Sequence, residues 1–213
     1  KLITLIILMD GEGTLLHHFL GVKKKMINFS NFISIYDNAL DKNFCTQIIE
    51  DFENDKENQT EGKSGNHQIK LHVKKSTDIN HSFTDNSSTS KIISSCLRTY
   101  IQEYKKVYPD IDALPPWRIT NAYNIQKYNP SDGYYKTHCE VTDRLSGKRV
   151  LVWMIYLNSV NDGGTLFPSY DIGVQAMQGR LVLWPPYWTH HHKGQISHTK
   201  TKYIATGWYE FIQ

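Results

Sequence analysis

The stretch THCE places His138 and Glu140 two positions apart. In an extended strand, residues i and i+2 point to the same face, so both side chains could bind one metal ion while Cys139 points away. Two neutral imidazoles and one carboxylate form a set that holds a first-row transition metal and leaves positions open for chemistry. A chain with ten histidines contains about one such pair by chance, so the pair needs further support.

The third ligand is sought in the triplet His190, His191 and His192, which is the densest supply of imidazole in the chain. On a strand, His190 and His192 share one face, and His191 points to the other face. Strand parity therefore leaves His190 and His192 as alternative ligands.

A cation with suitable neighbours follows the triplet. Lys202, Thr206 and Trp208 have the same strand parity, so a cation, a hydroxyl and an aromatic ring share one face, and Tyr203 and Ala205 point the other way. A cosubstrate that binds the metal as an anion needs a cationic partner for its far carboxylate. Lys202 is the candidate for that partner.

These residues belong to a wider pattern. The stretches YNPSDGYYKTHCE, YLN, DGGTLFP, HKG and KYIATGW resemble the prolyl 4-hydroxylase-type dioxygenases that depend on Fe(II) and 2-oxoglutarate. The resemblance covers residues 33–211 and is strong from residue 123 onward. It implies a double-stranded β-helix, or jelly roll, in an α+β but mainly β chain with two supporting helices on the N-terminal side.

The resemblance also assigns roles to single residues. In that family the distal histidine ligand lies ten residues before the basic residue that binds 2-oxoglutarate, and ten residues before Lys202 lies His192. The implied metal ligands are therefore His138, Glu140 and His192, with His190 beside the site and His191 pointing outward. The implied contacts to 2-oxoglutarate are Lys202, Tyr128, Tyr156, Thr206, Trp208 and Leu166. Tyr135 matches a further family position, to which we assign no role.

The activity implied by the resemblance is hydroxylation of an unactivated C–H bond in a peptidyl proline or a related substrate, with succinate and CO2 as coproducts. Fe(II), 2-oxoglutarate and O2 are the implied cofactors, and ascorbate is the implied reductant. The family usually has Asp where this chain has Glu140, which displaces the carboxylate by about 1.5 Å. This difference keeps the metal ligand and bears on the rate of turnover.

Two other functions fit parts of the pattern. A catalytically silent metal-binding jelly-roll module would need the ligands alone. An oxidative demethylase of nucleic acids is disfavoured, because that branch has Arg at the anchor and again six residues later, where this chain has Lys202 and Trp208. The formal net charge of +3 also lacks the concentrated basic face of a nucleic-acid binder, so we expect a peptide or small-molecule substrate and no nucleic acid.

Length and composition suit one domain of 213 residues. We expect residues 1–25 to be an extension outside the fold, with Leu2 to Leu8 as an edge strand in the alternative reading, and residues 26–213 to form a single dioxygenase domain. Within it, residues 26–116 supply helical support and a variable loop, and residues 117–213 supply the jelly-roll core. Three scattered cysteines predict a reducing, cytoplasmic location without membrane association. The oligomeric state is not predicted.

The pattern of apolar residues predicts the elements that position the site. We expect a strand ending at Asp37, a helix over 41–54 that buries Phe44, Ile48, Ile49 and Phe52, and a helix over 91–108 ended by Pro109. Between the helices, residues 54–90 read as a polar surface loop with one strand over 67–75, and His67, His72 and His81 as surface histidines. From residue 117, eight short alternating segments indicate an antiparallel sandwich or barrel.

Overall fold

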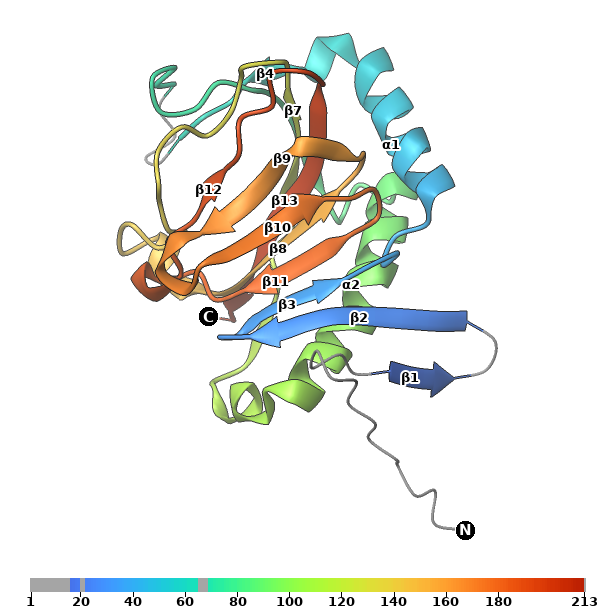
Figure 1. Cartoon of the computed structure of the whole chain (residues 1–213), viewed down its shortest axis with the longest axis vertical. Helices are drawn as coiled ribbons and strands as arrows, with labels where there is room; N and C mark the ends of the chain where they lie inside the picture. Colours follow the sequence, from blue (N-terminus) through green and yellow to red (C-terminus); the bar gives the residue numbers. More distant parts are fainter. Residues whose placement is uncertain (1–15, 20–21, 65–68, 213) are drawn as a thin grey trace.

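The computed structural model describes residues 16–19, 22–64 and 69–212. In these residues two antiparallel sheets face one another, and two helices cover the outer face of the larger sheet (Figure 1). This arrangement is the jelly roll that the sequence predicts. The alternative edge strand over residues 2–8 lies outside the described residues.

The larger sheet has the strand order β1-β2-β3-β11-β8-β13-β7-β5-β4, and β6 pairs with β13. Its strands are β1 (Leu16–Phe19), β2 (Val22–Ser30), β3 (Ile33–Tyr36), β4 (Thr60–Glu61), β5 (Thr77–Ser82), β6 (Trp117–Ile119), β7 (Ala122–Tyr128), β8 (Arg149–Tyr156), β11 (Leu181–Trp184) and β13 (Lys202–Phe211). The smaller sheet has the order β10-β9-β12, from β9 (Val160–Phe167), β10 (Ile172–Ala176) and β12 (Lys193–Gly194).

Both helices begin at capped positions close to those predicted. Helix α1 (Lys42–Asn54) follows Asp41, whose carboxylate accepts from the Asn43 amide, and α2 (Ser88–Val107) follows the capping residue Ser87. Short 3-10 turns complete the helical elements: η1 (Lys56–Asn58), η3 (Pro109–Ala113), η4 (Ser146–Lys148), η5 (Pro168–Tyr170) and η6 (Trp188–His190). None of the described helices is long and apolar enough to cross a membrane.

The alternation of side chains along the central strands separates two cores. On β8, Val152 and Met154 face the space between the sheets, whereas Leu151 and Trp153 face the helices. The predicted inward face of α2 is confirmed, because Ile93, Cys96, Leu97, Tyr100, Ile101 and Tyr104 are all buried. On α1 the prediction was wrong at one position: Phe44 is exposed, and Cys45 is buried beside Ile48 and Phe52.

The variable segment differs from its prediction. The expected strand over 67–75 does not form in the part of it that is described: residues 71–73 make a turn and Lys74 forms a single bridge to Tyr134. The apolar side chains that suggested a strand, Ile69 and Leu71, are half exposed, so no core is there to bury them. The strand of this region is β5, which pairs with β7.

Two histidines of this region, His72 and His81, lie within the described residues. His72 is exposed as expected, but His81 on β5 is partly buried and stacks on Tyr123 with 5.2 Å between ring centroids. Because burial lowers the pKa of His81, its ring packs as a neutral aromatic group and is not a surface histidine. His67 lies outside the described residues.

Part of the predicted extension continues the larger sheet, because β1 pairs with β2 and β2 pairs with β3. The partners that join β2 to β3 all lie at Met26 or beyond it. The boundary at residue 25 therefore stays a prediction, which deletion can test.

Candidate metal centre

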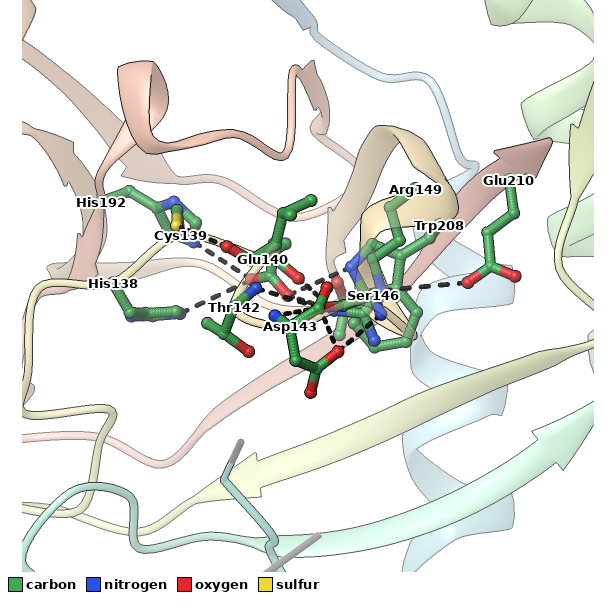
Figure 2. A network of polar contacts seen from close by, with 12 residues as sticks. His138, Cys139, Glu140, Thr142, Asp143, Ser146, Arg149, His192, Trp208 and Glu210 are labelled. Atoms are coloured by element: carbon green, nitrogen blue, oxygen red, sulfur yellow. Dashed lines mark hydrogen bonds and ion pairs between the residues drawn. The ribbon is translucent and has the colours of Figure 1, made fainter. Parts of the chain in front are cut away.

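His138, Glu140 and His192 converge at one point between the sheets. The Glu140 Oε1 atom lies 3.5 Å from His138 Nε2 and 3.4 Å from His192 Nε2. One ligand atom from each residue can be chosen so that all three lie within 4.8 Å of one another. Figure 2 shows both imidazoles directed at the carboxylate. Two imidazole nitrogens and a carboxylate oxygen at this spacing fit a divalent transition metal.

The backbone brings the two histidines together in a way that differs from the prediction. Residues 134–140 are not a strand of either sheet; they meet the other chain segment through one antiparallel bridge between His138 and His192. The His138 amide donates to the His192 carbonyl at 2.9 Å, and the His192 amide donates to the His138 carbonyl at 2.8 Å. This bridge is enough to place both side chains on the same side.

Backbone carbonyls orient both imidazoles. The Nδ1 atom of His138 lies 3.0 Å from the carbonyl oxygen of Lys136, and the Nδ1 atom of His192 lies 3.0 Å from that of His190. Each carbonyl can only accept, so we assign the proton to Nδ1, which leaves the Nε2 lone pair for a metal.

Aromatic rings enclose the two imidazoles. Tyr134 stacks on His138 with 3.6 Å between ring centroids, and Trp184 and Phe167 pack against His192 at 5.1 and 5.6 Å. Tyr134 was missed by the sequence reasoning, because nothing in its local pattern distinguishes it from Tyr135. The Tyr135 side chain is partly exposed and donates to the Ser131 carbonyl.

The two imidazoles favour the ionised form of Glu140. Burial by itself would raise its pKa, but His138 and His192, when they carry a proton on Nε2 in the absence of a metal, lower that pKa well below the ordinary value through hydrogen bonds and charge. The Trp208 Nε1 donates to Oε2 at 3.1 Å, and the Arg149 Nη1 donates to the Glu140 carbonyl oxygen at 2.5 Å. Arg149 was not predicted, because only the register of β8 against β13 brings it to the site.

Within the histidine triplet, the His192 side chain lies beside Glu140, whereas the His190 side chain is directed elsewhere. His190 is buried, but its Nε2 lies 2.8 Å from the Asn31 carbonyl and its Nδ1 2.9 Å from Thr189 Oγ1, so its side chain is committed elsewhere. The prediction that its side chain lies beside the metal is corrected: only its carbonyl contacts His192. His191 is partly exposed, and its Nδ1 contacts the Trp188 carbonyl.

Lys202 is a buried cation whose side chain is short of partners. It is 5 % exposed, its Nζ donates to the Gln195 carbonyl at 3.2 Å, and it lies 5.2 Å from the centre of the Tyr128 ring. Burial lowers the pKa of Lys202 to about 8. No carboxylate of the described residues forms an ion pair with Lys202, so an anionic ligand would supply the charge partner that this side chain lacks.

The two predicted tyrosines are buried and already have protein partners. The Tyr128 hydroxyl donates to Gln126 Oε1 at 2.7 Å, and the Tyr156 hydroxyl lies 2.6 Å from Thr165 Oγ1. Burial raises the pKa of both phenols, so both remain neutral donors. Any contact that they make with a cosubstrate shares or replaces these bonds.

Of two further predicted contacts, Thr206 lies on the predicted face of its strand and Leu166 does not. Thr206 has the predicted parity, although its hydroxyl donates to the Trp153 carbonyl at 2.9 Å. Leu166 is corrected: Thr165 and Phe167 on either side of it are buried, so Leu166 faces the outer side of the smaller sheet, above Gly173. Thr165 is the inward residue that contacts Tyr156.

The comparisons with known proteins agree with this geometry. Residues 123–210 match the 2OG-Fe(II) oxygenase superfamily, whose members use Fe(II), 2-oxoglutarate and O2. No curated protein sequence matches this chain.

Several solved prolyl hydroxylases share the fold. The enzyme of Trichoplax adhaerens, in complex with a hypoxia inducible factor peptide, is 17% identical with a TM-score of 0.67, over 85% of this chain and 84% of that one. A Pseudomonas putida prolyl-4-hydroxylase is 14% identical with a TM-score of 0.62, over 85% and 93%. The viral collagen prolyl hydroxylase of Paramecium Bursaria Chlorella virus-1, in complex with 2-oxoglutarate, is 15% identical with a TM-score of 0.61, over 86% and 98%.

The family match covers the segment that holds all three candidate ligands and Lys202, and the fold extends the likeness over most of the chain. Residues 123–210 are thus similar to the 2OG-Fe(II) oxygenase superfamily, and the chain has the fold of the prolyl hydroxylases, which together support a 2-oxoglutarate- and Fe(II)-dependent dioxygenase.

Proposed function

We propose that this protein is a 2-oxoglutarate- and Fe(II)-dependent dioxygenase that hydroxylates an unactivated C–H bond of a peptidyl proline or a related substrate, with succinate and CO2 as coproducts. The observation that carries the proposal is the convergence of His138, Glu140 and His192 in the same interior as the buried cation Lys202. A metal site alone would suit many proteins. A metal site together with a buried cation lacking a carboxylate partner suits a cosubstrate that has two carboxylates.

In this proposal His138, Glu140 and His192 hold the metal through Nε2, a carboxylate oxygen and Nε2. Bound Fe(II) supplies the activation of O2, coupled to oxidative decarboxylation of 2-oxoglutarate. The chain contributes the positions of these ligands, since the carbonyls of Lys136 and His190 fix the imidazole planes.

Lys202 binds the far carboxylate of 2-oxoglutarate in this proposal. The ammonium group is desolvated, and a charge-assisted hydrogen bond in such surroundings is stronger than one between neutral groups. Tyr128 lies under the Lys202 amine and Tyr156 faces the same core, so their hydroxyls supply further donors after local rearrangement. Thr206 and Trp208 lie on the same face of β13 as Lys202, and in this proposal they line the cosubstrate site beside it.

The substrate class rests on the likeness to solved structures. The Trichoplax enzyme was solved with a hypoxia inducible factor peptide, and the viral enzyme is named a collagen prolyl hydroxylase. A proline-containing peptide is therefore the substrate to test first. Ascorbate as reductant and a cytoplasmic location stay predictions.

Two assays test the proposal. Succinate formation from 2-oxoglutarate, with Fe(II) present and no peptide, tests uncoupled turnover, and mass spectrometry of a proline-rich peptide library tests for products that have gained one oxygen atom. Turnover that is lost in His138→Ala but present in the native chain supports the site. A native chain that binds Fe(II) yet forms no succinate with any substrate would overturn the proposal.

A further inference from the structure

The two carboxylate oxygens of Glu140 lie in different surroundings. Oε1 is the atom nearest to both imidazoles, at 3.5 and 3.4 Å from their Nε2 atoms. Oε2 accepts a hydrogen bond from Trp208 Nε1 at 3.1 Å and lies 3.5 Å from Arg149 Nη1. One oxygen is therefore open to a metal, and the other is bound by protein donors (Figure 2).

The two donor residues, Arg149 and Trp208, also contact each other. The Arg149 guanidinium lies over the Trp208 ring, 3.7 Å from its centre, and its Nη1 donates to the Glu140 carbonyl oxygen. The neighbouring ends of β8 and β13 are tied by Lys148 and Glu210 at 2.8 Å. Stacking on an aromatic face fixes the guanidinium plane, so Arg149 and Trp208 act as one rigid unit.

A glutamate ligand needs such a restraint more than an aspartate does. Its side chain has one more rotatable bond, so an unrestrained carboxylate can rotate to offer both oxygens to a metal or turn away from it. A hydrogen bond and a cation on Oε2 remove that freedom, because rotation would leave these donors without a partner.

We propose that Trp208 and Arg149 are positioning residues that hold Oε2, so that Glu140 presents Oε1 alone to the metal. The pair, which we call the Glu140 clamp, offsets the extra length of Glu140 and keeps a coordination position open. This inference rests on the metal site of the proposed function. It gives Trp208 a role toward Glu140 that is separate from lining the cosubstrate pocket.

The test uses Co(II) as the probe, because its visible absorption reports coordination number. Trp208→Phe keeps an aromatic ring beneath Arg149 and removes the Nε1 donor. It should raise the Co(II) dissociation constant about 10-fold to 100-fold, the usual effect of removing an outer-shell partner. It should also lower the Co(II) absorption per ion, as expected when a carboxylate binds through both oxygens. Trp117→Phe removes a donor remote from the site and is the matched control.

A second background separates positioning from packing. In Glu140→Asp, where the shorter carboxylate is withdrawn from Trp208, the added Trp208→Phe change should alter Co(II) affinity far less. An effect that agrees within about twofold in both backgrounds overturns the clamp. An unchanged Co(II) dissociation constant and an unchanged Co(II) spectrum for Trp208→Phe alone would also overturn the clamp. This single-variant result is the deciding test if Glu140→Asp binds no Co(II).

Arg149→Lys provides an independent variant if Trp208→Phe does not fold. Lysine keeps the charge and loses the planar stack, so it should change the Co(II) spectrum in the same direction, and an unchanged spectrum contradicts the proposal. If the native chain itself binds no Co(II), the proposed metal site fails. If it binds Co(II) and the clamp variants behave like the control, only the clamp fails.

Discussion

Lys202 is a buried cation that no carboxylate of the described residues pairs with, which favours binding of an anionic ligand. A buried ammonium group usually acquires a carboxylate, because desolvation makes an uncompensated charge costly. Among the described residues Lys202 has only the Gln195 carbonyl and the Tyr128 ring as close partners. An arriving carboxylate would therefore gain a partner that is already desolvated.

Lys202→Met should leave metal bound and raise the apparent dissociation constant of 2-oxoglutarate by one to two decades, because a charge-assisted bond of about 1.5–3 kcal/mol is lost. Equilibrium titration of the metal-loaded protein measures this. Lys200→Met, two residues earlier and exposed, is the matched control. If Lys200→Met weakens binding and Lys202→Met does not, the anchor has been assigned to the wrong lysine.

The same residue predicts a pH dependence. Burial lowers the pKa of Lys202 from its ordinary value to about 8, so the amine is charged below this pH and neutral above it. The affinity for 2-oxoglutarate should therefore be high below about pH 8 and fall as the pH rises further. Titrations at several pH values check this, and Lys202→Arg, which stays charged, should flatten the curve. A native affinity that rises above pH 8 contradicts this sign.

The histidine triplet gives three separable outcomes. His192→Ala should remove metal binding, because a ligand is lost. His190→Ala should lower the free energy of unfolding by about 1–3 kcal/mol, because its buried bond to the Asn31 carbonyl is lost, while metal binding persists through the unchanged backbone carbonyl. His191→Ala should change neither property. Metal content and urea unfolding of the three variants distinguish them, and loss of metal in His190→Ala alone would reverse the ligand assignment.

Residue types and spacing predicted some of the site and could not predict the rest. His138, Glu140 and Lys202 could be proposed because their chemistry is specific and their neighbours in sequence share their faces. Arg149 and Tyr134 could not, since an arginine at a strand start and a tyrosine beside another tyrosine are common. Leu166 was misplaced by one residue, and on a strand one residue reverses the face.

At the scale of elements, segment 73–75 joins the variable region to the site. Its backbone bonds to residues 133–135, which include Tyr134 beside His138, and Lys74 within it forms a buried ion pair with Asp78 of β5 at 2.6 Å. Asp78 also accepts from Ser76 and from Gln126, which is the partner of Tyr128. A chain of buried polar contacts thus connects this segment to Tyr128, a proposed contact of the cosubstrate.

Asp78→Ala should lower the free energy of unfolding by about 3–5 kcal/mol, because Lys74 is left buried without its partner. Chemical denaturation measures this. Lys106→Met, which breaks an exposed pair with Glu103, should cost less than about 1 kcal/mol. Adding Lys74→Met to Asp78→Ala should recover part of the loss, and a further loss instead would show that the stranded charge is not the cause.

The helices were more predictable than the variable segment for a physical reason. A long amphipathic pattern such as that of α2 has many residues on one face, so local periodicity already specifies what is buried. The stretch around Ile69 and Leu71 alternates like a strand, but alternation shows only that a strand could form. Whether a neighbouring strand and a core exist there is decided by distant residues.

At the scale of the whole molecule, the β-rich half was predictable as a sandwich or barrel, and the resemblance narrowed it to a jelly roll. The order of the strands could not be read from the pattern, because β3 lies beside β11 and β8 beside β13 through pairings between distant residues. The N-terminal boundary depends on such pairings as well.

A chain that begins at Met26 lacks β1 and the first residues of β2, yet it keeps Met26, Phe29 and Ser30, the residues that pair with β3. Its thermal unfolding midpoint should fall by less than about 4 °C, which corresponds to about 1 kcal/mol in a domain of this size. Co(II) binding should be unchanged. A larger fall would show that residues 1–25 are part of the folded domain.

The backbone bridge between His138 and His192 has a consequence for how quickly the site can be loaded. Two hydrogen bonds close a small ring between residues that are far apart in sequence, and we predict that this ring forms on folding without an ion. Because the ligands would already be in place, binding an ion would require the ion to lose its own bound water and would order the protein little further. The amides of His138 and His192 should be as protected from hydrogen exchange in the metal-free protein as those of the adjoining sheet, and the association rate of an ion should follow its own rate of water exchange.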